Sequence, residues 1–162
     1  MYTLIARMNP DYDIYLLFST NESHVDLELT PLVEALLSYS NINVRYFNMY
    51  EYAEGTPLQE FINSNQLLQS KFEKVHTSDA MRVFTLYKYG GVYFDLDVLS
   101  LLPLRVLNRK NFACLEQNNR FQNCILAMDL KEGRNFSSQY LELLNKNYDR
   151  NAWASNGPIM IS

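Results

Sequence analysis

Hydrophobic residues recur along this chain with two alternating periods, that of a buried helix face and that of a strand. Apolar positions three and four residues apart indicate helices, and short runs of β-branched and aromatic residues indicate strands. The pattern predicts helices at residues 2–8, after Thr30, after Thr56, from Ser78 to Gly90 and at 136–148, and strands at 14–18, 44–47 and 92–94. Such alternation predicts an α/β fold with a mostly parallel sheet, in which ligands bind beyond the carboxyl ends of the strands.

Two of these helices carry a recognisable start. Thr56 and Gln59 have the spacing of a capping box, in which each side chain satisfies a free backbone donor of the other. Ser78 is a good N-cap residue, and Asp79 would then lie in the first turn, where the helix dipole favours a negative charge. Gly90 suits the left-handed residue that ends this second helix.

The stretch VHTSDAMRVFTLYKYGGVYFDLDVLSLLP, residues 75–103, is the most informative part of the sequence. A predicted helix ends at a Gly-Gly pair, and a short apolar strand then leads to Asp95 and Asp97. Alternate residues of an extended chain point to the same side, so the two carboxylates are expected to share a face. Mg²⁺ and Mn²⁺ bind through one or two carboxylates together with substrate phosphates. The sequence therefore predicts a site for a divalent cation and a diphosphate, where the metal would neutralise charge on a departing group.

The D-x-D spacing alone is not specific, because Asp11 and Asp13 have it too. They follow a proline and precede a strand, so we interpret that pair as a solvated turn. An acidic loop at a strand end is the corresponding alternative for Asp95 and Asp97. The helix, the glycine pair and the apolar strand before them favour the metal site.

The composition narrows the classes of function. With 162 residues and 48% hydrophobic residues, the chain makes at most one domain with a real core. A net charge of −4 and a pI near 5.2 give no field for nucleic acid, so no nucleic-acid partner is expected. His24 and His76 lie far apart with no H-x-x-x-H or C-x-x-C partner, which argues against a zinc site. His76 is interpreted as a local structural residue, and its nearness to Asp79 leaves a role at the site open.

The two cysteines lie in strand-like segments, FACLEQ and NCILAM. A hairpin with its turn at NNRF would bring Cys114 and Cys124 opposite one another. A disulfide in an oxidising compartment and two buried free thiols both remain open, with free thiols favoured.

The stretch SDAMRVFTLYKYGGVYFDLDVLSLLPL resembles the DXD region of the lactosylceramide 4-alpha-galactosyltransferase family. Its order of S-D-x-x-R, G-G-x-Y and D-x-D is also similar to that of alpha-mannosyltransferases and glucosylating bacterial toxins. The segments YLLFSTN, NVRYFN, TPLQEF, NCILAM and WASNGP match the alpha-1,4-glycosyltransferases in order, so the resemblance covers nearly the whole chain. It implies a Rossmann-like GT-A fold that transfers a hexose from a nucleotide sugar with retention of anomeric configuration. On this basis residues 1–162 form a single, partial glycosyltransferase domain with its core at about residues 13–128.

The resemblance also implies roles for residues of the DXD region. Asp97 would ligate the metal directly, and Asp95 would contact the metal shell or the ribose. Asp79 and Arg82 would contact the donor sugar and the diphosphate. Because they are three residues apart on a predicted helix, they share a face and can act together. A surface ion pair is the alternative interpretation of Asp79 and Arg82.

Two further segments carry candidates by resemblance. Asn123 matches the asparagine of the family's N-G segment, which lies near the donor, although Cys124 stands here in place of the glycine. Asn156 and Gly157 match an N/Q-G-P element and are expected to bind the donor. Ser155 stands where some relatives have histidine.

The implied cofactor is Mn²⁺ or Mg²⁺, the implied donor a UDP-sugar and the implied acceptor a glycolipid or glycan. The resemblance further implies a type II enzyme of the Golgi membrane, on its lumenal side, held by an N-terminal anchor that this chain does not contain. The first helix opens inside the family pattern, so we expect a fragment that does not complete a catalytic cycle alone. Two alternatives remain: an alpha-mannosyltransferase that uses GDP-mannose, and a non-catalytic, glycosyltransferase-like binding protein.

Overall fold

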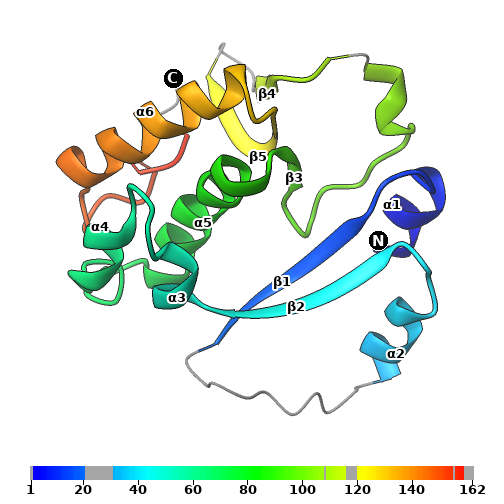
Figure 1. Cartoon of the computed structure of the whole chain (residues 1–162), viewed down its shortest axis with the longest axis horizontal. Coiled ribbons are helices and arrows are strands. Elements are labelled where there is room, and N and C mark those ends of the chain that lie inside the picture. Colours follow the sequence, from blue (N-terminus) through cyan, green and yellow to red (C-terminus); the bar gives the residue numbers. More distant parts are fainter. Residues whose placement is uncertain (1, 21–30, 108, 116–119, 155, 159–162) are drawn as a thin grey trace. The chain divides into compact units, whose positions relative to one another are not determined.

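The structure is a computed structural model that describes residues 2–20, 31–107, 109–115, 120–154 and 156–158 (Figure 1). The chain divides into two compact units, Met1–Tyr52 with Leu96–Asn108 and Ala53–Asp95 with Arg109–Ser162. The elements are, in chain order, α1 (Tyr2–Met8), β1 (Ile14–Thr20), α2 (Pro31–Leu37), β2 (Ile42–Asn48), α3 (Met49–Ala53), α4 (Gln59–Asn63), α5 (Glu73–Tyr89), β3 (Gly91–Phe94), the 3₁₀ helix η1 (Leu104–Leu107), β4 (Phe112–Leu115), β5 (Phe121–Met128) and α6 (Glu132–Asn147).

The first unit is built on the parallel strands β1 and β2, which pair over their full length. Ala6, Leu36 and Ile42, from α1, α2 and β2, form its buried core. The side-chain amide of Asn41 donates to the carbonyl oxygens of Ala6 and Asn9, at 3.1 Å each. These bonds satisfy carbonyl groups left free at the end of α1, and they fix that helix to the start of β2.

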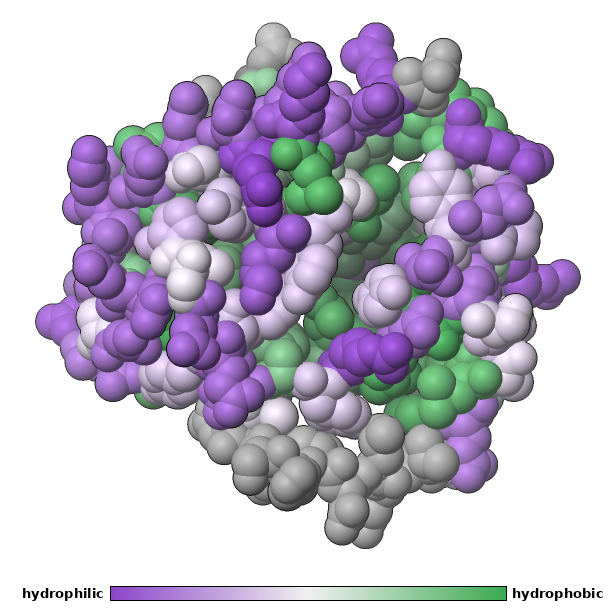
Figure 2. Space-filling model, viewed as in Figure 1, coloured by the Kyte–Doolittle hydropathy of each residue, from purple (hydrophilic) through white to green (hydrophobic). Residues whose placement is uncertain are grey.

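The second unit contains an antiparallel sheet in the order β3-β5-β4. Helix α5 packs against β5 and against α6 (Figure 1). Figure 2 shows hydrophilic side chains over the outer face of α6, so the apolar stripe of this helix is turned inward. The largest fully buried hydrophobic side chains of the unit are Leu58, Phe61, Ile62, Leu67, Val83, Phe84, Leu126, Leu141 and Leu144.

The start of α6 is fixed by an aspartate and a glycine. One carboxylate oxygen of Asp129 accepts hydrogen bonds from the backbone N–H groups of Lys131, Glu132 and Gly133, at 2.9, 2.7 and 3.1 Å. These bonds lower the pKa of Asp129 below its ordinary value. A Cβ atom on Gly133 would lie 2.7 Å from that of Met128, so glycine permits the close approach of helix and strand. The helix therefore begins at Glu132, before the expected residue 136.

The structure confirms the predicted strands and corrects three helix starts, that of α6 and those of α5 and α4. The strands expected at 14–18, 44–47 and 92–94 are β1, β2 and β3, each slightly longer than predicted. Helix α5 begins at Glu73, so Ser78 lies inside the helix and is not its N-cap. Helix α4 begins at Gln59 and has no side-chain cap. Thr56 Oγ1 donates back to the carbonyl of Ala53 instead, so the capping box does not form.

The expected solvated turn is present, and so is the antiparallel pairing of the expected hairpin, whose turn at NNRF lies largely outside the described residues. Asp11 and Asp13 are exposed and lie outside helix and strand. Strands β4 and β5 pair antiparallel, with a register shift between Ala113 and Cys114. Because of this shift Cys114 lies opposite Gln122, not opposite Cys124. Both cysteines are free and half-buried, and burial raises the pKa of the Cys114 thiol.

The fold is α/β, as predicted. Among the described strands, however, only β1 and β2 pair parallel, and β3, β5 and β4 pair antiparallel, so the expectation of a mostly parallel sheet is corrected. Over the described residues, no helix is both long enough and apolar enough to cross a membrane.

Candidate functional site

The site is built around two charged residues on one face of α5. Asp79 and Arg82 are three residues apart and are only 3% and 6% exposed. Arg82 Nη2 lies 3.3 Å from Asp79 Oδ1, so they form a buried ion pair and not the alternative surface pair. Burying two charges is costly unless each is paired and hydrogen-bonded. The surroundings of Arg82 and Asp79 meet that requirement.

Hydrogen bonds, an ion pair and an aromatic ring fix the position of the Arg82 guanidinium. Its Nε donates to the carbonyl of Ser78 at 3.2 Å, and Nη2 donates to the Ser78 hydroxyl at 2.9 Å. Nη1 donates to the Asn123 carbonyl at 2.8 Å and lies 3.2 Å from Asp95 Oδ1. The plane of the group lies over the Tyr93 ring, 4.9 Å from its centroid. Arg82 is therefore a fixed positive charge that bridges α5 to the ends of β3 and β5.

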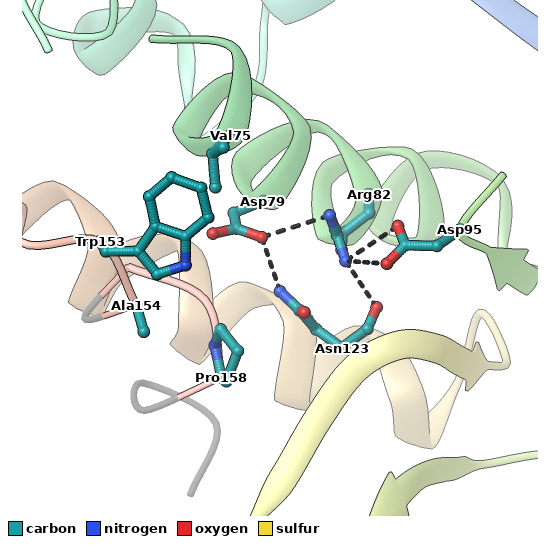
Figure 3. Close-up of a pocket in the computed structure, with 8 residues that line it drawn as sticks. All are labelled: Val75, Asp79, Arg82, Asp95, Asn123, Trp153, Ala154 and Pro158. Carbon is teal, nitrogen blue, oxygen red and sulfur yellow. Dashed lines mark hydrogen bonds and ion pairs between the residues drawn. The ribbon is translucent and has the colours of Figure 1, made fainter. Parts of the chain in front are cut away.

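Asn123 connects β5 to the acidic side of the site. Its side-chain amide donates to Asp79 Oδ1 at 2.8 Å, while its own carbonyl accepts from Arg82 (Figure 3). The next residue, Cys124, accepts a backbone hydrogen bond from Asp95 at 2.8 Å, which continues the pairing of β3 and β5 beyond Phe94. This backbone pairing places the Asp95 carboxylate beside Arg82.

The electrostatics of the site reflect its burial. Burial raises the pKa of Asp79 above its ordinary value, while Arg82 and the hydrogen bond from Asn123 oppose the rise. Burial also raises the pKa of Tyr93 to about 12. The Tyr93 hydroxyl therefore stays protonated, and it donates to Asp95 Oδ1 at 2.7 Å.

A turn near the end of the described chain closes one side of the site. A Cβ atom on Gly157 would lie 2.5 Å from Asp79 Oδ2 and 2.7 Å from Asn123 Nδ2, so the backbone here lies directly against the pair. The fully buried Asn156 fixes this turn. Its carbonyl accepts from the Tyr140 hydroxyl, and its side chain exchanges hydrogen bonds with the backbone of Asp149.

These residues surround a pocket of about 180 Å³. Figure 3 shows the charged and amide groups on one side and the indole of Trp153 on the other. The polar lining is Asp79, Arg82, Asp95 and Asn123, and the remaining lining is Val75, Trp153, Ala154 and Pro158.

The structure brings together four of the seven predicted site residues in this pocket, Asp79, Arg82, Asp95 and Asn123. Asn156 and Gly157 lie beside this pocket. In the described part of the chain, every buried polar atom of the Asn156 side chain has a hydrogen-bond partner, and the Gly157 backbone lies against Asp79 and Asn123.

Asp97 is placed differently from the expectation. Strand β3 ends at Phe94, and Asp97 lies in an exposed turn that belongs to the first unit. The alternation of an extended strand therefore ends before the second carboxylate, so the strand does not place Asp95 and Asp97 on one face.

The apolar wall of the pocket was not predicted from the residues. Val75 carries no sequence signal for a site, and Pro158 carries one only as the proline of the N/Q-G-P element. Trp153 does carry one, because it is the chain's single tryptophan and it stands in the WASNGP segment that matches the resembled family.

The donor atoms suit a divalent cation that shares its ligands with a substrate. In the described part of the chain, no group of three His, Cys, Asp or Glu side chains is arranged to hold a metal by itself. Mg²⁺ and Mn²⁺ bind through one or two carboxylates plus phosphate oxygens. Asp95 is partly exposed and Asp97 is exposed, and a role for the two carboxylates at a metal stays a prediction.

Comparison with known proteins identifies the class. The family described as "Glycosyltransferase sugar-binding region containing DXD motif" matches residues 1–122, and the chain belongs to this family. A solved structure, PaToxG Glycosyltransferase, is similar with a TM-score of 0.64 over 99% of this chain and 59% of that chain. At 18% identity this likeness concerns the fold, and it confirms the predicted glycosyltransferase fold.

Two curated relatives are similar over most of the chain. Lactosylceramide 4-alpha-galactosyltransferase of Mus musculus is 26% identical over 158 residues, which cover 97% of this chain and 43% of that protein. Alpha-1,4-N-acetylglucosaminyltransferase of Homo sapiens is 25% identical over 132 residues, which cover 82% of this chain and 37% of that protein. The chain thus spans less than half the length of these relatives.

Proposed function

We propose that this chain is the donor-binding part of a retaining glycosyltransferase. The enzyme would move a hexose, galactose or N-acetylhexosamine, from a UDP-sugar to a glycolipid or glycan. The observation that carries the proposal is the buried network of Asp79, Arg82, Asn123 and Asp95, open to a pocket on one side. A buried, fully paired arginine beside a pocket is a preorganised partner for developing negative charge.

Arg82 would provide the fixed positive charge in the transfer. The bond between the anomeric carbon and the diphosphate oxygen would break with its electron pair leaving on the diphosphate, a bond to the acceptor oxygen would form, and the acceptor hydroxyl would pass its proton to the departing diphosphate. Negative charge grows on the departing diphosphate, and an arginine that needs no reorganisation stabilises it. The carboxyl group of Asp79, fixed beside Arg82, would accept hydrogen bonds from sugar hydroxyls.

A divalent cation, Mn²⁺ or Mg²⁺, would be held by Asp95 and Asp97 and would neutralise the diphosphate when bound. Asp95 also keeps Arg82 in place, at 3.2 Å. The carboxylate therefore connects the fixed arginine to the metal-binding side of the site.

The proposed setting is the lumenal side of the Golgi membrane, supported by the kinds of relative that the chain resembles. Calorimetric titration with UDP, UDP-galactose, UDP-N-acetylglucosamine and GDP-mannose, each with and without Mn²⁺, tests the donor class. We expect the UDP-sugars to bind more tightly than GDP-mannose. Binding of GDP-mannose alone would favour the alpha-mannosyltransferase alternative.

A further inference from the structure

Trp153 is a large aromatic residue that stays 60% exposed at a pocket whose other wall is charged. We propose that the indole face of Trp153 is a platform on which the pyranose ring of a hexose stacks. The ring's hydroxyl groups would then face Asp79 and Asn123. This inference rests on the proposed function, because it assigns a ligand to the same pocket.

The indole is held in place and is not a freely moving surface side chain. It packs edge-to-face with Phe72, with ring centroids 5.1 Å apart and planes at 84°. The carbonyl of the preceding residue, Ala152, lies 3.0 Å from Nε2 of His76, which is 1% exposed. Since a carbonyl only accepts, His76 donates this bond from Nε2.

His76 is fixed in turn from its other side. Its Nδ1 lies 2.7 Å from the Ser70 hydroxyl and 3.0 Å from the Tyr148 hydroxyl, both of which can donate to it. A fully bonded, buried histidine thus holds the backbone on which Trp153 stands. A ligand that stacks there would lose little free energy to ordering the protein, because the wall is already in position.

The two walls of the pocket suit the two sides of a sugar. A pyranose has a C–H face that is apolar and a rim of hydroxyl groups that need hydrogen-bond partners. Trp153 and Pro158 provide apolar surface, and Asp79 and Asn123 provide an acceptor and an amide (Figure 3). The volume of about 180 Å³ is below the ~300 Å³ at which pockets for drug-sized ligands begin, so it suits one ring and not a whole nucleotide sugar.

The sugar that stacks could come from the donor or from the acceptor, and the test has an arm for each. Because Trp153 is the single tryptophan, the intrinsic tryptophan fluorescence of the chain reports this wall alone. Emission is recorded while the full chain is titrated with UDP, UDP-galactose, UDP-N-acetylglucosamine or methyl β-lactoside. Calorimetry gives the same affinities independently of the fluorophore, for wild type, Trp153→Ala and Trp153→Phe.

We expect a UDP-hexose to change the emission more than UDP does. Trp153→Ala should weaken UDP-hexose binding about tenfold, the scale of one aromatic contact, and leave UDP affinity within about twofold. Trp153→Phe should restore most of the loss. Phe136→Ala, which removes an exposed aromatic ring from the outer side of α6, should change neither affinity. If methyl β-lactoside alone gives these effects, the stacked sugar is the acceptor's and the platform stands.

A failure of the stacking platform can be distinguished from a failure of the proposed function. If Trp153→Ala binds UDP-hexose and methyl β-lactoside as wild type does, the platform is refuted while the proposed donor site remains. If wild type binds no UDP and no UDP-hexose in calorimetry, the proposed donor site fails, and the platform fails with it unless methyl β-lactoside binds and loses affinity in Trp153→Ala.

Discussion

The backbone of Gly157 lies so close to Asp79 that a Cβ atom at position 157 would be 2.5 Å from Oδ2 of the carboxylate. The two residues are 78 positions apart in the sequence, and the backbone at Gly157 also lies against the side-chain amide of Asn123. We therefore expect Gly157→Ala to displace either the turn or the carboxylate. Overpacking of this kind costs about 1–3 kcal/mol, and UDP-hexose affinity measured by calorimetry should fall with it.

Gly133→Ala is the matched control, because a Cβ atom there would also crowd its neighbours, 2.6 Å from Asn111 and 2.7 Å from Met128. It should lower the free energy of unfolding in urea and leave the affinity of the folded chain unchanged. Equal effects of the two variants on affinity would show that Gly157 acts only through stability.

The sequence could predict the local parts of this site and not the parts that depend on packing. Asp79 and Arg82 share a face of α5 because helical spacing requires it, and the structure agrees. Ser78 has the residue type of an N-cap, but α5 continues to Glu73, so a local signal was overridden by the longer helix.

Spacing along the sequence could not predict the contacts of the site between residues far apart in the chain. Asn123 meets Asp79 across 44 positions because β5 packs against α5, and spacing cannot reveal such a contact. Resemblance to a family indicated Asn123, Asn156 and Gly157. Trp153 was missed as a wall of the pocket because a lone exposed tryptophan has no periodic pattern.

Arg82→Ala should reduce transfer by about a hundredfold or more in the complete enzyme, the scale for losing one electrostatic stabiliser. It should also destabilise the fold, by about 3–5 kcal/mol, because Asp79 would stay buried without its partner. Kinetics on the folded enzyme separate the two effects.

Arg134→Ala is the control for Arg82→Ala. Arg134 also donates from Nε to a backbone carbonyl, that of Tyr87, and lies over its ring, but it is exposed on α6. Transfer and stability should change little in this variant. If Arg82→Ala turns over substrate as fast as wild type does, Arg82 has a structural role only.

Stability should depend on pH in opposite senses through two carboxyl groups. Burial raises the pKa of Asp79 in the folded chain above the ordinary 3.8 of the unfolded chain. At pH values between 3.8 and the raised pKa, the folded chain therefore binds more protons than the unfolded chain. The contribution of Asp79 to the free energy of unfolding is therefore present below pH 3.8 and falls as the pH rises through that window. In Asp79→Asn this loss should be absent. Urea unfolding measured from about pH 4 to about pH 7 checks it.

Asp129 provides the opposite case. Backbone hydrogen bonds lower its pKa, so its contribution is present above pH 3.8 and is lost as the pH falls through the lowered value. Asp129→Ala should remove that loss of stability on acidification.

For Asp79, the same pH dependence of stability in Asp79→Asn and in wild type would contradict the burial of an ionisable carboxyl at position 79.

Metal-assisted binding of a nucleotide diphosphate is the central claim, and the UDP affinity with and without Mn²⁺ tests it most directly. The comparison needs wild type, Asp97→Asn and Asp13→Asn, because Asp13 ends a D-x-D of the same spacing in an exposed turn. We predict that Mn²⁺ raises the UDP affinity of wild type and of Asp13→Asn, and that Asp97→Asn abolishes this gain. UDP affinity that is independent of Mn²⁺, or a gain that survives in Asp97→Asn, would contradict the account.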